Sequence, residues 1–460
     1  MNKLFNAMTH ADSFTENGAV TNSTSGSFLV DLFGRAGSSR GTNLVGEFLQ
    51  AFKENPDLAI RLALYTRDPR GGYGERKHFR QWIGYILKKV DLETGKAIVS
   101  KIPEIGRFDD LIPVIELGGD IKAHAITVWL RAIAVEKNAL AAKWMPRKGT
   151  IFGEVRRHLG VPPKTLRKLL VETTNVVETQ MCNREWDQIE YSKLPSRAQL
   201  LYRKAFARND GERYEEYLSA LEKGEAKVNS SVLYPYEIVA NSSGQLREAQ
   251  WKALPDYVGE GSFLPMIDVS GSMYQQAGNT RFTTMQVAMS LGIYLAERNK
   301  GVFKDQFLTF SERPRMQELC GDTLETRLRN LSRAHWGMNT DINRAMQTIL
   351  DRAVANGLTD EDLPDALIVL SDMEFDRCGS SPVSEKTIRD FEASGFTAPK
   401  LVFWNIASRR DNVPVRAGQN GTVLVSGFSA AVMKTVLSGE VVTPLDMVKS
   451  ALCVPKYDYL

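Results

Sequence analysis

The pattern of apolar and polar positions divides the chain into two halves. Over residues 28–221 apolar side chains recur at helical spacing, as at Leu44 and Phe48, which would share one helix face. Over residues 256–460 short apolar runs alternate with helix-like segments, an order typical of a doubly wound parallel sheet. The pattern therefore predicts an all-α domain followed by an α/β domain.

The individual elements follow from the same periodicity. In the first half, helices are expected at 43–52, 57–65, 79–90, 93–102, 121–142, 164–171 and 200–207. In the second half, strands are expected at 263–267, 305–310, 366–370, 400–406 and 421–425, with helices at 282–298, 323–331, 342–356, 384–393 and 430–438. Short helices joined by Gly and Pro turns suggest a HEAT-like stack of helix pairs, although no strict repeat period is visible.

The two halves are joined and preceded by polar segments. Residues 1–27 are rich in Ser, Thr, Asn and Gly, so we expect a poorly ordered arm there. Residues 222–255 begin with a charged, polar stretch and form the expected connection between the helical domain at 28–221 and the α/β domain at 256–460.

Composition places the chain among soluble globular proteins. Of its 460 residues 43% are hydrophobic and 25% are charged. No run of 18 apolar residues appears, so no transmembrane helix or membrane partner is expected, and the N-terminus lacks the apolar core of a signal peptide. The four cysteines are far apart, which favours the reducing cytoplasm and argues against a zinc site.

Charge is unevenly distributed along the chain. The net charge is +3, and Lys and Arg exceed Asp and Glu only in residues 1–255, by 37 to 30. The first half is therefore the basic half, an excess that permits nucleic-acid binding without establishing it.

An apolar run ends abruptly in an acid and two hydroxyls at 263–273 (FLPMIDVSGSM). Asp268, Ser270 and Ser272 alternate through the turn, so their oxygens can converge at the carboxyl edge of the sheet, where open α/β sheets bind ligands. Carboxylate and hydroxyl oxygens suit Mg²⁺, with Mn²⁺ and Ca²⁺ as alternatives. The other interpretation is an ordinary turn, in which such side chains bond their own backbone.

Two later stretches favour the metal site. A polar loop contains Thr340, and a second buried-strand run ends at Asp372. An Asp-Xaa-Ser-Xaa-Ser motif, a loop Thr and a strand-ending Asp in this order resemble the metal-ion-dependent adhesion site of von Willebrand factor A domains. The resemblance implies that Asp268, Ser270, Ser272 and Thr340 surround the cation, that Asp372 holds it directly or through water, and that an open position captures an acidic group of a partner. Asp341, Glu374 and Asp376 are either outer partners of this site or exposed loop acids.

Basic clusters on the helical half are candidate RNA-binding surfaces, because Arg and Lys grip phosphates and nearby aromatic rings stack on bases. The candidates are Arg67, Arg70, Arg76, Lys77, Arg80, Arg156, Arg157, Lys164, Arg167, Lys168, Arg203 and Lys204. The alternative is a solvated helix face whose charges pair with acids such as Asp68, Glu75 or Asp109.

Three segments of the helical half carry a family resemblance: 67–76 (RDPRGGYGER), 102–111 (IPEIGRFDDL) and 176–187 (VVETQMCNREWD). With 336–341 and 371–376 they resemble an uncharacterised family of plant, bacterial and phage proteins that has a helical region before a von Willebrand A-like domain. The layout is more distantly similar to the Ro autoantigen family, whose TROVE domain is a ring of helical repeats. That resemblance implies a monomer that forms a ring. It also implies a ribonucleoprotein, in which the protein binds single-stranded or small structured RNA. No individual RNA-contacting residue carries over.

Three functions follow as hypotheses. The first is a non-enzymatic RNA-binding protein with a divalent-cation site that captures an acidic partner group. The second is a metal-dependent protein–protein adaptor or assembly factor that binds no RNA. An enzyme such as a nuclease is disfavoured, because the sequence offers neither a second metal site nor a water-activating base beside the first.

Overall fold

The computed structural model describes residues 13–15, 20–309, 314–333, 342–375, 385–408, 412–436 and 441–460. The chain folds as two compact units. The α/β unit takes its described residues from 1–59 and 234–453, and the helical unit consists of 60–233 and 454–460. These limits differ from the expected domains, because residues 28–59 belong to the α/β unit and the chain crosses between the units three times.

The α/β unit is built on a six-stranded sheet in the order β5-β4-β3-β6-β7-β8, in which only β5 is antiparallel to its neighbour. The strands are β3 (Phe263–Ile267), β4 (Gln306–Thr309), β5 (Met316–Glu318), β6 (Ala366–Ser371), β7 (Lys400–Asn405) and β8 (Thr422–Ser426). Every residue of β3, β6 and β8 is buried, as expected for strands covered on both faces. The predicted parallel α/β fold of this half is confirmed.

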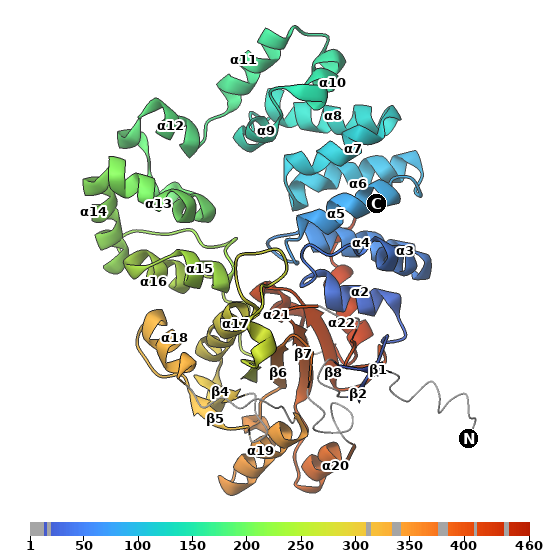
Figure 1. Ribbon diagram of the computed structural model, residues 1–460, viewed down its shortest axis with the longest axis vertical. Coiled ribbons are helices and arrows are strands. Elements are labelled where there is room, and N and C mark those ends of the chain that lie inside the picture. The colour runs from blue at the N-terminus through green and yellow to red at the C-terminus, as the bar shows by residue number, and fades with distance from the viewer. Residues whose placement is uncertain are drawn as a thin grey trace. The chain divides into compact units, whose positions relative to one another are not determined.

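Helices of the α/β unit cover the sheet (Figure 1). They are α2 (Phe28–Ala36), α3 (Val45–Glu54), α15 (Pro235–Asn241), α16 (Gly244–Lys252), α17 (Thr284–Arg298), α18 (Leu324–Ser332), α19 (Ile342–Ala355), α20 (Glu385–Ala393), α21 (Met433–Val436) and α22 (Pro444–Leu452), with 3-10 turns at Gly271–Tyr274, Gly301–Phe303, Asp360–Asp362 and Ala430–Val432. Gly292 allows α17 to approach β3 closely, because a Cβ there would lie 2.3 Å from Ile267 Cδ1 and would force that side chain to shift.

The N-terminal helix α2 packs on the edge strand β8. The Ser426 hydroxyl donates to the Phe33 carbonyl at 2.7 Å, and a Cβ on Gly34 would lie 2.5 Å from Leu424 Cδ2. Because α2 is needed to cover β8, residues that read as the start of the helical domain complete the α/β unit.

The segment before α2 also joins this unit. A short antiparallel pair, β1 (Ser13–Phe14) and β2 (Val20–Thr21), is followed by a backbone bridge between Asn22 and Val413. Residues 1–12 and 16–19 of the expected arm lie outside the described residues. In 20–27, where a poorly ordered arm was expected, the backbone instead bonds to the α/β unit, with the Asn22 carbonyl accepting from Val413 N at 2.9 Å.

The helical unit is all-α, as the periodicity predicted, and its helices follow one another from α4 to α14 in Figure 1. They are α4 (Pro56–Arg67, entering from the α/β unit), α5 (Arg76–Ile86), α6 (Leu92–Ile105), α7 (Ile112–Leu117), α8 (Gly119–Ala134), α9 (Ala139–Trp144), α10 (Gly149–Leu159), α11 (Pro163–Thr173), α12 (Val177–Asn183), α13 (Ser196–Asn209) and α14 (Gly211–Glu222), with 3-10 turns at Phe108–Leu111, Trp186–Gln188, Tyr191–Lys193 and Pro455–Tyr457. The helix expected at 121–142 is two helices. Lys137 has a φ of 52°, and the Asn138 side chain caps α9 by accepting from Leu140 N at 3.0 Å.

The glycine-rich segment after α4 folds back on that helix. Tyr73 N donates to the Tyr65 carbonyl, and a Cβ on Gly72 would lie 1.9 Å from the same carbonyl oxygen. Only glycine fits this backbone approach. The turn places Asp68 in the interior, where it is fully buried.

The segment 454–460 closes over that buried acid. The Tyr457 hydroxyl donates to Asp68 Oδ2 at 2.8 Å, and the Lys456 ammonium pairs with the same oxygen. Burial and the charge of Asp68 raise the pKa of Tyr457 far above its usual range, so the phenol stays protonated and donates. The returning segment therefore neutralises a carboxylate that would otherwise be buried unpaired.

Among the described residues, no helix combines the length and the apolar character that crossing a bilayer requires.

Candidate functional site

Two acidic residues lie side by side at the carboxyl edge of the sheet. Strands β3 and β6 pair in register with Ile267 opposite Leu370, and Asp268 N donates to the Leu370 carbonyl at 3.0 Å. Asp268 and Asp372, which directly follow these strands, are each only 2% exposed. Topology therefore brings together two residues that are far apart in the sequence, as the metal-site prediction required.

The turn after β3 gathers the predicted oxygen donors. Asp268 Oδ1 accepts from Ser270 N at 2.8 Å, and the Ser270 and Ser272 hydroxyl oxygens are 3.0 Å apart. Asp268 Oδ2 accepts from the Ser371 hydroxyl at 2.6 Å. An ordinary turn at an Asp also makes the hydrogen bond to Ser270 N, so this bond does not distinguish a metal site from such a turn. The burial and charge of the two aspartates are the remaining criteria.

Burial and charge make an ionised carboxylate pair unfavourable at this position. Burial, reinforced by the nearby charge of Asp372, raises the pKa of Asp268 from 3.8 to about 7. A carboxylate pair in a dry site is unfavourable unless a proton or a cation neutralises one of its charges. Two carboxylates and two hydroxyls are donors that suit Mg²⁺, Mn²⁺ or Ca²⁺, so these residues fit such an ion.

The remaining residues assigned to this site have different outcomes. Thr340, Asp341 and Asp376 lie outside the described residues. Glu374 is buried and accepts from Asn412 Nδ2 at 3.0 and 3.1 Å, so it is not an exposed loop acid. In the part of the chain that the structure describes, no group of three or more His, Cys, Asp and Glu side chains is placed to hold a metal.

Two arginines of the first basic cluster stabilise the helical unit. Arg67, which is 4% exposed, donates from Nε to Asp110 Oδ2 at 2.6 Å. Arg80 donates from Nε to Asp110 Oδ1 at 2.7 Å and pairs with Asp109 at 2.8 Å. Arg67 therefore forms a buried structural ion pair, the alternative interpretation of this cluster, and its charge is already neutralised within the fold.

The other cations of this cluster differ from Arg67. Arg76 is exposed and has no ion pair with any described residue. Partial burial of its guanidinium, together with repulsion from Arg107 and Arg80, lowers the pKa of Arg76. Arg70 N donates to Asp68 Oδ1 at 2.9 Å, and the Glu75 side chain caps α5 by accepting from Lys77 N at 2.9 Å.

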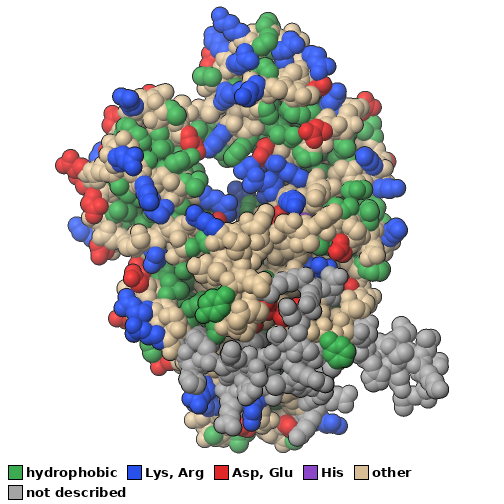
Figure 2. Space-filling model, in the orientation of Figure 1, with side chains coloured by type: hydrophobic (Ala, Val, Ile, Leu, Met, Phe, Trp, Pro, Cys, Tyr) green, Lys and Arg blue, Asp and Glu red, His purple; other side chains and the backbone are tan. Residues whose placement is uncertain are grey.

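The second and third clusters lie on α10, α11 and α13. Arg157 pairs with Glu154 and Lys168 with Glu172, whereas Arg156 and Lys164 make no ion pair with described residues. Figure 2 shows Lys and Arg side chains gathered over the region of α10 and α11. Of the remaining candidates, Arg167 lies over the Phe152 ring and Arg203 donates to the Leu200 carbonyl at 2.6 Å. Lys204 is exposed.

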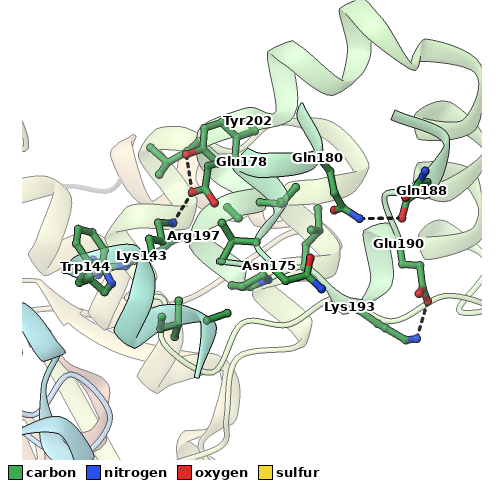
Figure 3. A pocket seen from close by; sticks show the side chains of 18 of the residues that line it. Lys143, Trp144, Asn175, Glu178, Gln180, Gln188, Glu190, Lys193, Arg197 and Tyr202 are labelled. Carbon is green, nitrogen blue, oxygen red and sulfur yellow. Dashed lines mark hydrogen bonds and ion pairs between the residues drawn. The ribbon is translucent and has the colours of Figure 1, made fainter. Parts of the chain in front are cut away.

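Sequence reasoning missed a pocket of about 770 Å³ within the helical unit. It lies between α9, α12 and α13, and none of the candidate RNA-binding residues lines it (Figure 3). Arg107 and Glu178, which do line it, come from two of the three segments that carried the family resemblance, 102–111 and 176–187. Those segments were the available signal, but their convergence depends on the fold.

Comparisons with known proteins identify two family models and a relative of this chain. Two family models, each described as a domain of unknown function, match residues 262–451 (DUF7788) and 154–261 (DUF2828). The chain is 29% identical to the uncharacterized protein L728 of Acanthamoeba polyphaga mimivirus over 504 aligned positions, covering 96% of this chain and 87% of the relative.

A solved structure shares the fold over nearly the whole chain. The crystal structure of the Deinococcus radiodurans Ro (RSR) protein matches with a TM-score of 0.52 at 16% identity, covering 94% of this chain and all of that one. At this identity the match shows the fold alone. The chain therefore has a Ro-like architecture, with an all-α region and a mainly parallel α/β region.

Proposed function

We propose that this chain is a non-enzymatic RNA-binding protein of Ro-like architecture, whose α/β unit holds a divalent cation that captures an acidic group of a partner. The observation that carries the RNA proposal is the fold shared with a Ro protein across 94% of the chain. It agrees with the Ro resemblance drawn from the sequence, which implies single-stranded or small structured RNA as the ligand.

The α10–α11 surface supports RNA binding by its charge. Arg156 and Lys164 have no acidic partner among the described residues, so their charges are available to phosphates. Their neighbours Arg157 and Lys168 pair with Glu154 and Glu172 at the surface, where ion pairs contribute little and exchange readily. Phosphate contacts of this kind bind RNA without reading its sequence.

The proposed cation site uses residues of the α/β unit only. Asp268, Ser270, Ser272 and Asp372 would supply oxygen ligands, with Thr340 as the further ligand implied by the von Willebrand A resemblance. With few anionic ligands, a bound Mg²⁺ keeps part of its charge and an open position, which suits a carboxylate of a protein partner. Ser371 supports the site by orienting Asp268, to which it donates at 2.6 Å.

RNA binding is tested by fluorescence anisotropy of a labelled, mixed-sequence single-stranded RNA, across a salt series, with Mg²⁺ and with EDTA. We expect salt-sensitive binding that survives EDTA, because the protein binds phosphates and the cation serves another partner. The double variant Arg156→Glu, Lys164→Glu should weaken binding and make the slope of log K against log salt shallower by about 0.7 for each phosphate that is no longer neutralised. The double variant Lys252→Glu, Lys449→Glu makes the same change in net charge at exposed positions of α16 and α22 and serves as the matched control.

A different result would favour the adaptor function. The cation site stands on Asp268 and Asp372 and needs none of the basic residues of the helical unit. Absence of RNA binding at low salt would refute the RNA proposal and leave a metal-dependent protein–protein adaptor as the function to pursue.

A further inference from the structure

The pocket between α9, α12 and α13 has apolar walls. Leu140, Trp144, Val176, Leu194 and Leu201 line it, together with neighbouring Ala and Pro side chains. Leu201 is 72% exposed and Leu140 is 53% exposed, although large apolar side chains are usually buried. The volume of this apolar pocket, about 770 Å³, is within the range of small-ligand sites.

Polar side chains line two edges of this pocket (Figure 3). At one edge Glu178 holds Lys143 at 2.6 Å and accepts from the Tyr202 hydroxyl at 2.8 Å. At the other edge Lys193 pairs with Glu190 at 2.7 Å. The edges also carry the side-chain amides of Asn175 and Gln180, which can donate to and accept from the rim of a planar heterocycle.

Arg107 lines the pocket and belongs to a cluster of arginines whose other members, Arg67, Arg76 and Arg80, lie outside the pocket lining. The Arg107 guanidinium carbon lies 3.6 Å from the centroid of the Trp144 ring, a cation–π stack in the pocket wall. Arg107 also donates to Asp109 at 2.8 Å, and Arg80 bonds to the same aspartate. The charges of Arg107 and Arg80 act on Arg76, which has no ion pair with a described residue.

This cluster has more positive than negative charge. Four arginines (Arg67, Arg76, Arg80 and Arg107) surround two aspartates, Asp109 and Asp110, whose oxygens are already bonded to three of them. An anion placed beside Arg76 and Arg107 would relieve their mutual repulsion. Arginine forks bind phosphate in this way, because their donors match its oxygens.

We infer that this pocket holds one unstacked nucleotide of a bound single-stranded RNA, with the base between the apolar walls and a phosphate at the arginine cluster. The inference deepens the proposed function and rests on it. A nucleotide has a planar face for the apolar walls, a polar rim for the side-chain amides and an anionic phosphate for the arginines. An acidic peptide would use the cations but would leave the amides and the ring surface without a specific role.

The inference predicts which side chains matter. Trp144→Ala removes part of the wall and the support of Arg107, and should weaken binding of a short single-stranded RNA roughly tenfold, the effect of losing one stacked base. Leu201→Glu places a negative charge in the pocket at an exposed position, so the fold should persist while binding falls by a similar factor. Val354→Glu, at a position 57% exposed on α19 and outside both the pocket and the α10–α11 surface, is the matched control.

The test measures anisotropy of a short fluorescein-labelled, mixed-sequence RNA with wild-type protein and the three variants. Free AMP, GMP, CMP and UMP are added as competitors, and their direct binding is measured by isothermal titration calorimetry. Weaker binding in Trp144→Ala and Leu201→Glu, but not in Val354→Glu, supports the pocket. RNA binding that Leu201→Glu leaves unchanged overturns it while the RNA-binding function stands. Mononucleotide binding without RNA binding overturns RNA as the source, and absence of both overturns both proposals.

A second measurement places the bound nucleotide directly. RNA containing 4-thiouridine is crosslinked to the wild-type protein by light, and the modified peptides are identified by mass spectrometry. Crosslinks in residues 139–144 or 194–202 support the pocket. Crosslinks found only on α10 and α11 would assign the RNA to the α10–α11 surface and overturn the inference.

Discussion

Replacing Asp268 by Asn at the end of β3 distinguishes a cation ligand from a structural acid. Asn keeps the size of the side chain and its hydrogen bonds, since its oxygen can accept from Ser270 N and its amide can donate to the Ser371 hydroxyl. The variant removes one of two charges from a buried pair. Its effect on unfolding should therefore have opposite signs with and without a cation.

The expected size follows from the electrostatics of the site. In the folded protein without a cation, burial and Asp372 raise the pKa of Asp268 from 3.8 to about 7. The raised value means that ionising Asp268 destabilises the fold as pH rises from about 4 to 7, by roughly 4 kcal/mol in total. At pH 8 in EDTA, Asp268→Asn should thus be about 1–3 kcal/mol more stable than wild type, after allowing for weaker hydrogen bonds.

Mg²⁺ should reverse this order. A cation at about a hundredfold excess over its Kd stabilises the fold by about 2.7 kcal/mol, which raises the Tm of the wild type by about 5–10 °C. The variant should show little response. Thermal unfolding followed by circular dichroism, in EDTA and across a Mg²⁺ series, measures both effects.

The control is Asp365→Asn at the opposite end of β6, where the side chain accepts from Ser262 N at 2.9 Å. This variant should respond to Mg²⁺ as the wild type does. If Asp268→Asn is less stable than the wild type in EDTA and the two respond equally to Mg²⁺, then Asp268 is a structural acceptor and the cation site is refuted.

Three further variants test the helical unit and the sheet packing, each by urea unfolding. Asp110→Ala leaves the buried Arg67 without its partner and should lower the free energy of unfolding by about 3–5 kcal/mol; a loss below about 1 kcal/mol would contradict the buried pair. Tyr457→Phe removes a donor to the buried Asp68 and should cost about 1.5–3 kcal/mol, whereas an unchanged midpoint would show that 454–460 does not dock in solution. Gly292→Ala crowds Ile267 between α17 and β3 and should cost about 1–3 kcal/mol, and a neutral result would mean that Ile267 repacks freely.

Local patterns located the parallel strands and several helices, but they missed β5 and helices such as α10 and α12, and they merged α8 with α9. Apolar runs ending in acids located β3 and β6, and parallel pairing then required Asp268 and Asp372 to meet. The same patterns placed residues 28–59 in the wrong unit, because helical periodicity shows which face is buried but not against what. The packing of α2 on β8 joins segments almost four hundred residues apart.

Candidate side chains were harder to predict than elements. Arg67 resembled a surface cation until the fold placed Asp110 beside it, 43 residues along the chain. The pocket draws on α9, α12 and α13, of which the sequence patterns predicted only α13 as a separate helix. The only sequence signal for the pocket was the family resemblance of segments 102–111 and 176–187. The backbone of the first segment packs closely on its own side chains, because a Cβ on Gly106 would lie 2.6 Å from Asp110 Oδ2.

The docking of 454–460 on the helical unit affects the order in which the protein can fold during synthesis. Residues 60–233 leave the ribosome first, and the whole of 234–453 is translated before the last segment of that unit appears. At about 5–20 residues per second this delay is roughly 10–40 s, during which Asp68 lacks Tyr457 and Lys456. The nascent helical unit therefore reaches its full stability only after the α/β chain has emerged, although it was made first.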